Sequence, residues 1–171
     1  GLLLSASTLP FLAYAASGGY APLDRRLYLP EDWAEDEARR EKCHVPPGVQ
    51  FREKWQIALE LLDRSLPGLP HGWIVGDDEF GRPSAFRDQL RRRRERYVLD
   101  VPCNTTIRDL QRRRPPRRAA GVGRKREVPF VRAASWAQSQ PASRWERITV
   151  RDGEKGPLEV EAMSVPVRYP R

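Results

Sequence analysis

The order of short apolar runs and amphipathic segments constrains the fold of this chain most strongly. The stretch 51–66 predicts a helix with one buried stripe, because its apolar residues follow spacings of four, three and four. They are Trp55, Leu59, Leu62 and Leu66. The run "GWIVG" at 72–76 then predicts a short buried strand, 84–95 a second helix and 96–102 another strand. Helices that join short apolar strands predict an α/β fold with a mixed sheet and right-handed crossovers.

Two hairpins flank these elements in the sequence. "PFLAYAA" at 10–16 and "APLDRRLYLP" at 21–30 lie on either side of a Gly-Gly turn, and "ITVRDGEKGPLEVEA" alternates around a second turn. We therefore expect three parts: a core at 1–102, an Arg- and Pro-rich basic segment at 103–143, and a hairpin region at 144–171. The middle part has too few apolar residues to form a packed layer by itself.

Basic residues are concentrated in one part of the chain. The formal net charge of +8 divides into −4 over residues 1–90, +11 over 91–132 and +1 over 133–171. Such a local excess favours contact with a polyanion. The alternative is a solvated, arginine-biased loop, because arginine outnumbers lysine by 27 to 4 in the whole chain. The candidate phosphate-binding residues are Arg91, Arg92, Arg93, Arg94, Arg112, Arg113, Arg114, Arg117, Arg118, Arg124, Lys125 and Arg126.

The cysteines and the N-terminal stretch bear on localisation. Cys43 and Cys103 lie 60 residues apart without a CxxC spacing, which predicts neither a disulfide framework nor a zinc site and favours a reduced, cytoplasmic protein. The Cys43-His44 pair is more typical of a surface loop than of a metal site. Residues 1–17 are apolar enough for a secretory signal, but they are too interrupted for a membrane span. The predicted hairpin at 10–30 overlaps this stretch, which favours residues 1–17 as part of the folded protein over a secretory signal.

Three acidic residues, Asp77, Asp78 and Glu79, directly follow the predicted strand at 72–76. A carboxylate at a strand end has a fixed position and is still accessible to a ligand, and Mg²⁺ prefers such hard oxygen ligands. Adjacent acids also occur as solvated residues where a strand ends, or as charges at a helix N-terminus. The residues alone leave both interpretations open.

Several blocks of the sequence resemble, in order and spacing, the DDE-superfamily transposases of bacterial insertion sequences. They cover most of 11–162, and "LDRRLYLPEDW" and "GDDEFG" are the most distinctive. The resemblance implies a ribonuclease-H-like core in which two Asp and one Glu bind two divalent ions, such as Mg²⁺, for DNA cleavage and strand transfer. Asp77 matches the second Asp of the family, which implies a catalytic, metal-binding role. Asp78 and Glu79 match variable positions.

The resemblance also implies an incomplete set of catalytic acids. The first Asp of the family lies upstream of the hairpin, where "GLLLSASTLP" contains no acid, and its Glu lies on a helix beyond the position of Arg171. Glu159 and Glu161 lie on the predicted hairpin instead. We therefore expect a partial transposase chain, with a partial ribonuclease-H-like sheet, that binds DNA but is inactive alone. The alternative is a non-catalytic, basic DNA-binding or interaction protein on the same scaffold.

Overall fold

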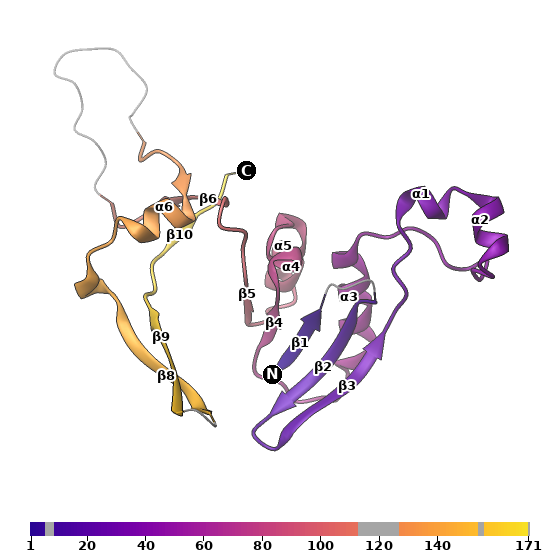
Figure 1. Cartoon of the computed structure of the whole chain (residues 1–171), viewed down its shortest axis with the longest axis horizontal. Helices are drawn as coiled ribbons and strands as arrows, with labels where there is room; N and C mark the ends of the chain where they lie inside the picture. The colour runs from indigo at the N-terminus through magenta and orange to yellow at the C-terminus, as the bar shows by residue number, and fades with distance from the viewer. Residues whose placement is uncertain (6–8, 113–126, 154–155, 171) are drawn as a thin grey trace, which may run out of the picture. The chain divides into compact units, whose positions relative to one another are not determined.

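The structure, a computed structural model, describes residues 1–5, 9–112, 127–153 and 156–170. The chain divides into two units, Gly1–Pro102 and Cys103–Arg171, and each unit has a sheet of its own (Figure 1).

A five-stranded mixed sheet organises the first unit. Its strands lie in the order β3-β2-β1-β4-β5, with β1 antiparallel to β2 and parallel to β4, and β4 parallel to β5 (Figure 1). The strands are β1 Leu2–Ser5, β2 Phe11–Ala16, β3 Gly19–Arg25, β4 Ile74–Gly76 and β5 Tyr97–Leu99. This arrangement confirms the predicted α/β class and is consistent with a ribonuclease-H-like fold. The strand β1 was not predicted, and it lies between the hairpin and β4.

The predicted hairpin forms, and Leu2–Ser5 and Phe11–Ala16 are strands of the sheet. The strands β2 and β3 pair from Ala16 and Gly19 outward, and Gly19 has a φ of 132°, which glycine adopts without strain. The side chains of Leu2, Leu4 and Leu12 are buried in the core. The paired β1 and the start of β2 therefore contradict the secretory-signal interpretation of this stretch within the described residues.

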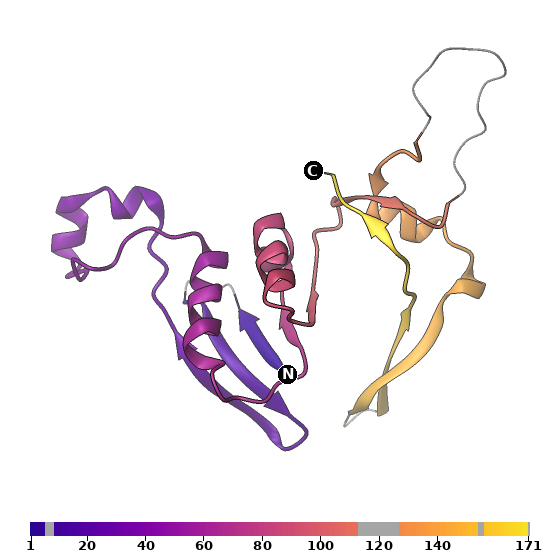
Figure 2. The ribbon, with the colours of Figure 1, turned by 180° about the vertical axis from the view of Figure 1, so that it is seen from behind.

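The helix α3, Lys54–Ser65, lies along the sheet (Figure 2) and has more buried residues than the other described helices. A capping box begins it, in which the Glu53 side chain accepts from the backbone of Gln56 and the Gln56 side chain accepts from the Glu53 backbone. The helix starts three residues later than predicted, because this cap fixes its first turn. Its buried residues are Ile57, Ala58, Leu59, Leu61 and Leu62.

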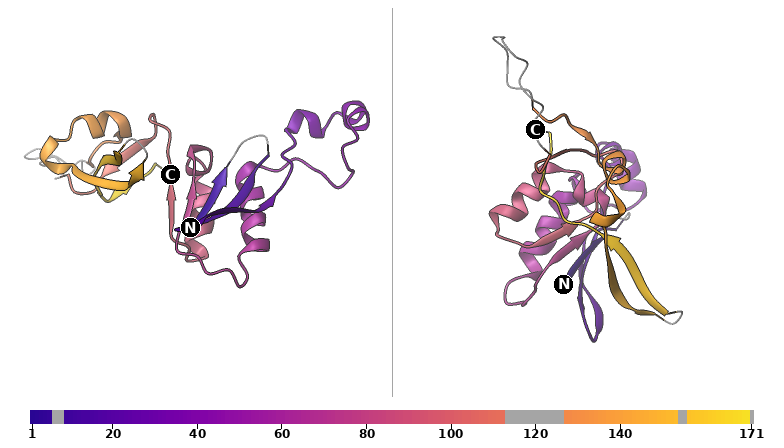
Figure 3. Two further views of the ribbon diagram at one scale, coloured as in Figure 1. Left: turned by 60° about the horizontal axis from the view of Figure 1, so that its bottom comes forward. Right: turned by 90° about the vertical axis from the view of Figure 1, so that its left-hand side faces the viewer.

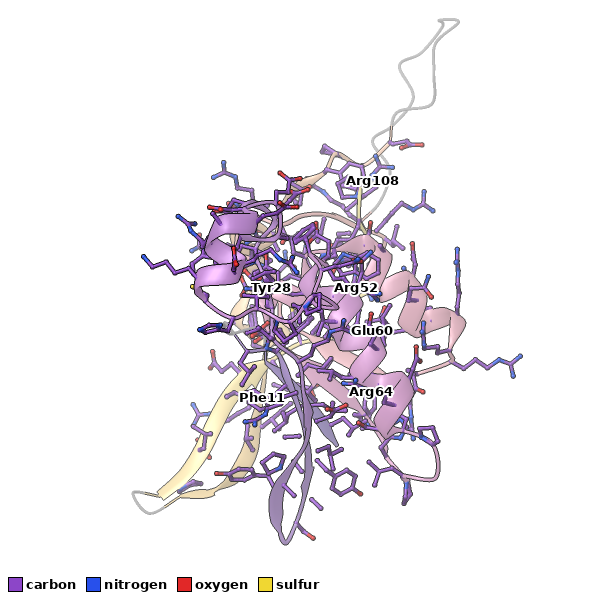
Figure 4. The ribbon with its side chains drawn as sticks, turned by 90° about the vertical axis from the view of Figure 1, so that its right-hand side faces the viewer. Phe11, Tyr28, Arg52, Glu60, Arg64 and Arg108 are labelled. Atoms are coloured by element: carbon purple, nitrogen blue, oxygen red, sulfur yellow. The ribbon has the colours of Figure 1, made fainter. Side chains whose placement is uncertain are left out.

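Ion pairs join the outer face of α3 to segments earlier in the chain. The carboxylate of Glu60 pairs with both Arg26, which follows β3, and Arg52, which precedes α3 (Figure 4). Arg64 donates to Asp24 on β3, with 2.8 Å between Nη2 and Oδ2. The contacts with Asp24 and Arg26 hold α3 beside β3.

Two further helices cover β4 and β5. They are α4, Asp78–Gly81, and α5, Ser84–Arg92. Phe80 on α4 and Phe86 on α5 are fully buried, with ring centroids 5.6 Å apart. The charged stretch before α3 forms two short helices, α1 Glu31–Ala34 and α2 Glu37–Lys42.

The second unit has a small sheet and a separate ribbon. The strands β6 Thr106–Asp109, β7 Val131–Arg132 and β10 Val167–Arg168 lie in the order β10-β6-β7, and α6 Ala133–Gln138 follows β7. A single turn of 3₁₀ helix, Ala142–Arg144, precedes the predicted hairpin of β8 Glu146–Gly153 and β9 Gly156–Ala162 (Figure 3). The sequence pattern predicted the ribbon but not the three-stranded sheet.

Candidate functional site

Three parallel strands of the first unit end side by side, and Asp77 follows the middle one. Gly76, the last residue of β4, lies in register with Leu4 of β1 and Leu99 of β5. The residues that come next on the three strands are Ser5, Asp77 and Asp100. The backbone N–H of Asp100 donates to the carbonyl oxygen of Gly76 at 3.0 Å, which keeps the β5 end beside the β4 end.

The position of Asp77 is set by the turn from β4 into α4. Asp77 is the N-cap residue of α4, and its carbonyl oxygen accepts the N–H groups of Phe80 and Gly81, each at 3.1 Å. A Cβ atom at Gly81 would lie 1.6 Å from the carbonyl oxygen of Asp100, and one at Gly76 would lie 2.9 Å from Leu99 Cδ2. The two glycines of "GDDEFG" therefore allow β4, α4 and β5 to pack closely around Asp77.

The other two acids of the motif belong to the start of α4. Asp78 and Glu79 lie in its first turn, where acidic side chains interact favourably with the helix dipole. Glu79 is exposed and pairs with Lys54 on α3 at 3.1 Å. Both residues thus have ordinary structural roles beside Asp77.

The described residues do not form the two-metal centre that the family implies. Among residues 1–5, 9–112, 127–153 and 156–170, no three Asp, Glu, His or Cys side chains lie close enough together to hold a metal ion. The strand β1, beside Asp77, has the sequence Leu-Leu-Leu-Ser. Asp24 on β3 pairs with Arg64, and Glu159 on β9 pairs with Arg147. Two divalent ions require more carboxylates than Asp77 and Asp100 supply.

The predicted phosphate-binding arginines have different environments where the structure describes them. Arg91 pairs with Asp88, a contact that lowers the pKa of that carboxyl, and Arg93 pairs with Asp63 at 3.0 Å. Arg92 and Arg94 are exposed near the end of α5. Arg112 lines a cavity in the second unit. The remaining candidates lie outside the described residues: Arg113, Arg114, Arg117, Arg118, Arg124, Lys125 and Arg126.

The sequence pattern missed two arginines that share the cavity with Arg112. Arg108 on β6 and Arg168 on β10 are 60 residues apart in the chain, yet they are direct partners in the antiparallel ladder. Neither belongs to a run of basic residues, so charge clustering in the sequence did not find them. Only the pairing of β6 with β10 brings them together.

The lengths of the helices and the similarity of the chain to known proteins complete the description. None of the helices within the described residues is long and apolar enough to cross a membrane. No curated protein and no solved structure matched the chain.

The family model described as DDE superfamily endonuclease matches residues 6–157. This match covers most of the 171 residues, including the sheet from β2 onward, the strand end at Asp77, and β8 with the start of β9. The chain therefore belongs to the DDE endonuclease superfamily.

Proposed function

We propose that this chain is part of an insertion-sequence transposase, and that the 171-residue polypeptide binds DNA without cleaving it. The observation that carries the proposal is the set of residues at the ends of β1, β4 and β5, which includes Asp77 but no acid on β1. A lone strand-end carboxylate provides one ligand of a two-metal centre, and transposases of this superfamily require the full set.

DNA is the partner that family and charge both favour. The superfamily consists of endonucleases that act on DNA, and residues 91–132 have a net charge of +11. Arginines attract phosphates regardless of the base sequence, so we propose a largely non-specific mode of binding. A cytoplasmic location is part of the same proposal.

We assign the metal-dependent reaction to the complete parent transposase. In the parent, Mg²⁺ would activate the attacking oxygen and stabilise the leaving oxygen during phosphoryl transfer. Asp77 is the residue of this chain that we propose as a ligand. Because the described residues do not fit a two-metal centre, we assign no catalytic step to this polypeptide.

The salt dependence of DNA binding tests the proposal. Purified protein should bind duplexes of unrelated sequence with similar affinity at low salt, as measured by fluorescence anisotropy. The dissociation constant should rise steeply with salt, because each phosphate contact releases a counterion and adds roughly 0.9 to the slope of log K against log salt. Salt-insensitive binding, or a strong preference for one sequence, would contradict it.

A further inference from the structure

A small cavity in the second unit brings together three arginines. Arg108, Arg112 and Arg168 line a space of about 120 Å³, together with the acidic residues Asp109 and Glu127. Arg108 and Arg168 are directly opposite each other on β6 and β10. Arg108 is labelled in Figure 4. Like charges in direct cross-strand positions repel each other, so this arrangement needs a negative group nearby.

The guanidinium of Arg108 is held in a fixed orientation. It lies 4.2 Å from the centroid of the Phe130 ring, it pairs with the carboxylate of Glu127, and its side chain is only 16% exposed. Among the described residues, its buried Nε–H has no hydrogen-bond acceptor. A buried guanidinium N–H without an acceptor is unfavourable, so an oxygen ligand that accepts from it would stabilise this group.

The two acidic residues of the cavity, Asp109 and Glu127, differ in how buried they are. Asp109 is buried, and its oxygens accept from the backbone N–H of Gln111 at 2.8 Å and from Trp136 Nε1 at 3.1 Å. Asp109 is therefore committed to the fold of its own unit. The side chain of Glu127 is 57% exposed, so an incoming anion is able to replace it beside Arg108 by letting it turn toward solvent.

We propose that this cavity binds one phosphodiester group of a DNA backbone. The proposal rests on the proposed function and names residues for it. A guanidinium presents paired N–H donors that match phosphate oxygens, and Arg108 is already oriented by Phe130. Arg112 and Arg168 are exposed, so a polymer backbone reaches them without entering the protein. Glu127 occupies the anion position in the absence of DNA.

The test compares Arg168→Gln with Arg147→Gln in the full chain. Arg147 lies on β8, is 70% exposed and does not line the cavity, so its loss removes the same charge at another place. We expect Arg168→Gln to weaken duplex binding about fivefold to tenfold and to lower the salt slope by about 1, as loss of one phosphate contact does. Arg147→Gln should change the affinity by less than about twofold, and Glu127→Gln should tighten binding.

Inorganic phosphate provides a second probe that does not depend on DNA. In ¹H–¹⁵N spectra, phosphate should shift the amides of Arg108 and Arg168 saturably in the wild type and not in Arg168→Gln. Circular dichroism should show that Arg168→Gln, Arg147→Gln and Glu127→Gln are folded.

Equal weakening by the two arginine variants would overturn the cavity as a DNA site and leave the proposed function intact. Binding of phosphate without any binding of duplex would contradict both. Binding of duplex without phosphate-induced shifts at Arg108 and Arg168 would also overturn the cavity site.

Discussion

Gly81 shows at the scale of one residue how tightly the strand ends are packed. A Cβ atom there would lie 1.6 Å from the carbonyl oxygen of Asp100, which is backbone and is unable to rotate away. Gly81→Ala should therefore shift β5 away from α4 and lower the free energy of unfolding by about 3 kcal/mol, at the upper end of typical overpacking costs. Urea denaturation measures this change.

Gly72→Ala is the matched control for this prediction. A Cβ atom at Gly72 meets nothing within 4 Å, so the substitution should change the free energy of unfolding by less than about 0.5 kcal/mol. Equal stability of the two variants would show that the β4–α4–β5 packing is wrong.

His71 links the stability of the first unit to pH. Its Nε2 lies 2.9 Å from Glu95 Oε2 and its Nδ1 lies 3.1 Å from the carbonyl oxygen of Leu69, so only the doubly protonated ring donates to both. The hydrogen bond with Glu95, and then the one with Leu69, raises the pKa of His71 above 6.5. The stabilisation is fully present below pH 6.5 and is lost as the pH rises through the raised folded-state value.

His71→Gln measures this contribution. The wild type should exceed the variant in melting temperature at pH 6 by more than it does at pH 9. His44→Gln provides the control, because it removes an imidazole from an exposed position outside the sheet. A difference between wild type and His71→Gln that stays constant with pH would mean that the imidazolium pair is not formed.

At the scale of elements, Glu60 connects α3 to two segments that precede it in the chain. Glu60 and Arg26 are about a quarter exposed, and Glu60→Ala would leave the half-buried guanidinium of Arg26 without this partner. We expect a loss of about 1–2 kcal/mol in the free energy of unfolding. Asp88→Asn removes a more exposed ion pair with Arg91, which solvent screens, and should leave the urea midpoint nearly unchanged. Similar losses in both variants would exclude a special role for Glu60.

The elements that the sequence predicted are those whose signal is local. The helix α3 and the β2–β3 hairpin follow from apolar spacing and turn residues within about twenty positions of each other. The β8–β9 ribbon follows from alternation around a Gly-containing turn.

The elements that the sequence missed depend on distant partners or are very short. The strand β1 is buried by β2 and β4, of which β4 lies seventy residues away. The β6 strand has four residues and pairs with β10, which has two and lies far along the chain, so neither strand is recognisable from its own residues. The four-residue helix α4 begins directly after its N-cap residue Asp77, so its first acidic residues resembled solvated residues at the end of a strand.

The candidate site was predictable in part. The position of Asp77 at the end of an inner strand followed from "GWIVGDD" and from the family resemblance, and the structure places it there. The neighbours Ser5 and Asp100 were not predictable as neighbours of Asp77, because strand order is a property of the whole sheet. The cavity at Arg108 and Arg168 was not predictable from the sequence either, because it depends on the pairing of β6 with β10.

At the scale of the whole molecule, we expect DNA binding to be independent of DNA cleavage. Asp77→Ala removes one negative charge at a strand end and should leave the duplex dissociation constant within about twofold of the wild type. Anisotropy titrations at one salt concentration measure this. A large loss of DNA binding in Asp77→Ala would place the DNA at the strand ends themselves.

The most direct measurement is a nicking assay on supercoiled plasmid with the same preparations, in Mg²⁺ and in Mn²⁺. We expect the 171-residue polypeptide to bind the plasmid, shown by retarded migration, and to produce no more nicked circles than Asp77→Ala or a metal-free control. Metal-dependent nicking by the wild type that Asp77→Ala abolishes would contradict the account, and would mean that other acids complete a metal centre around Asp77.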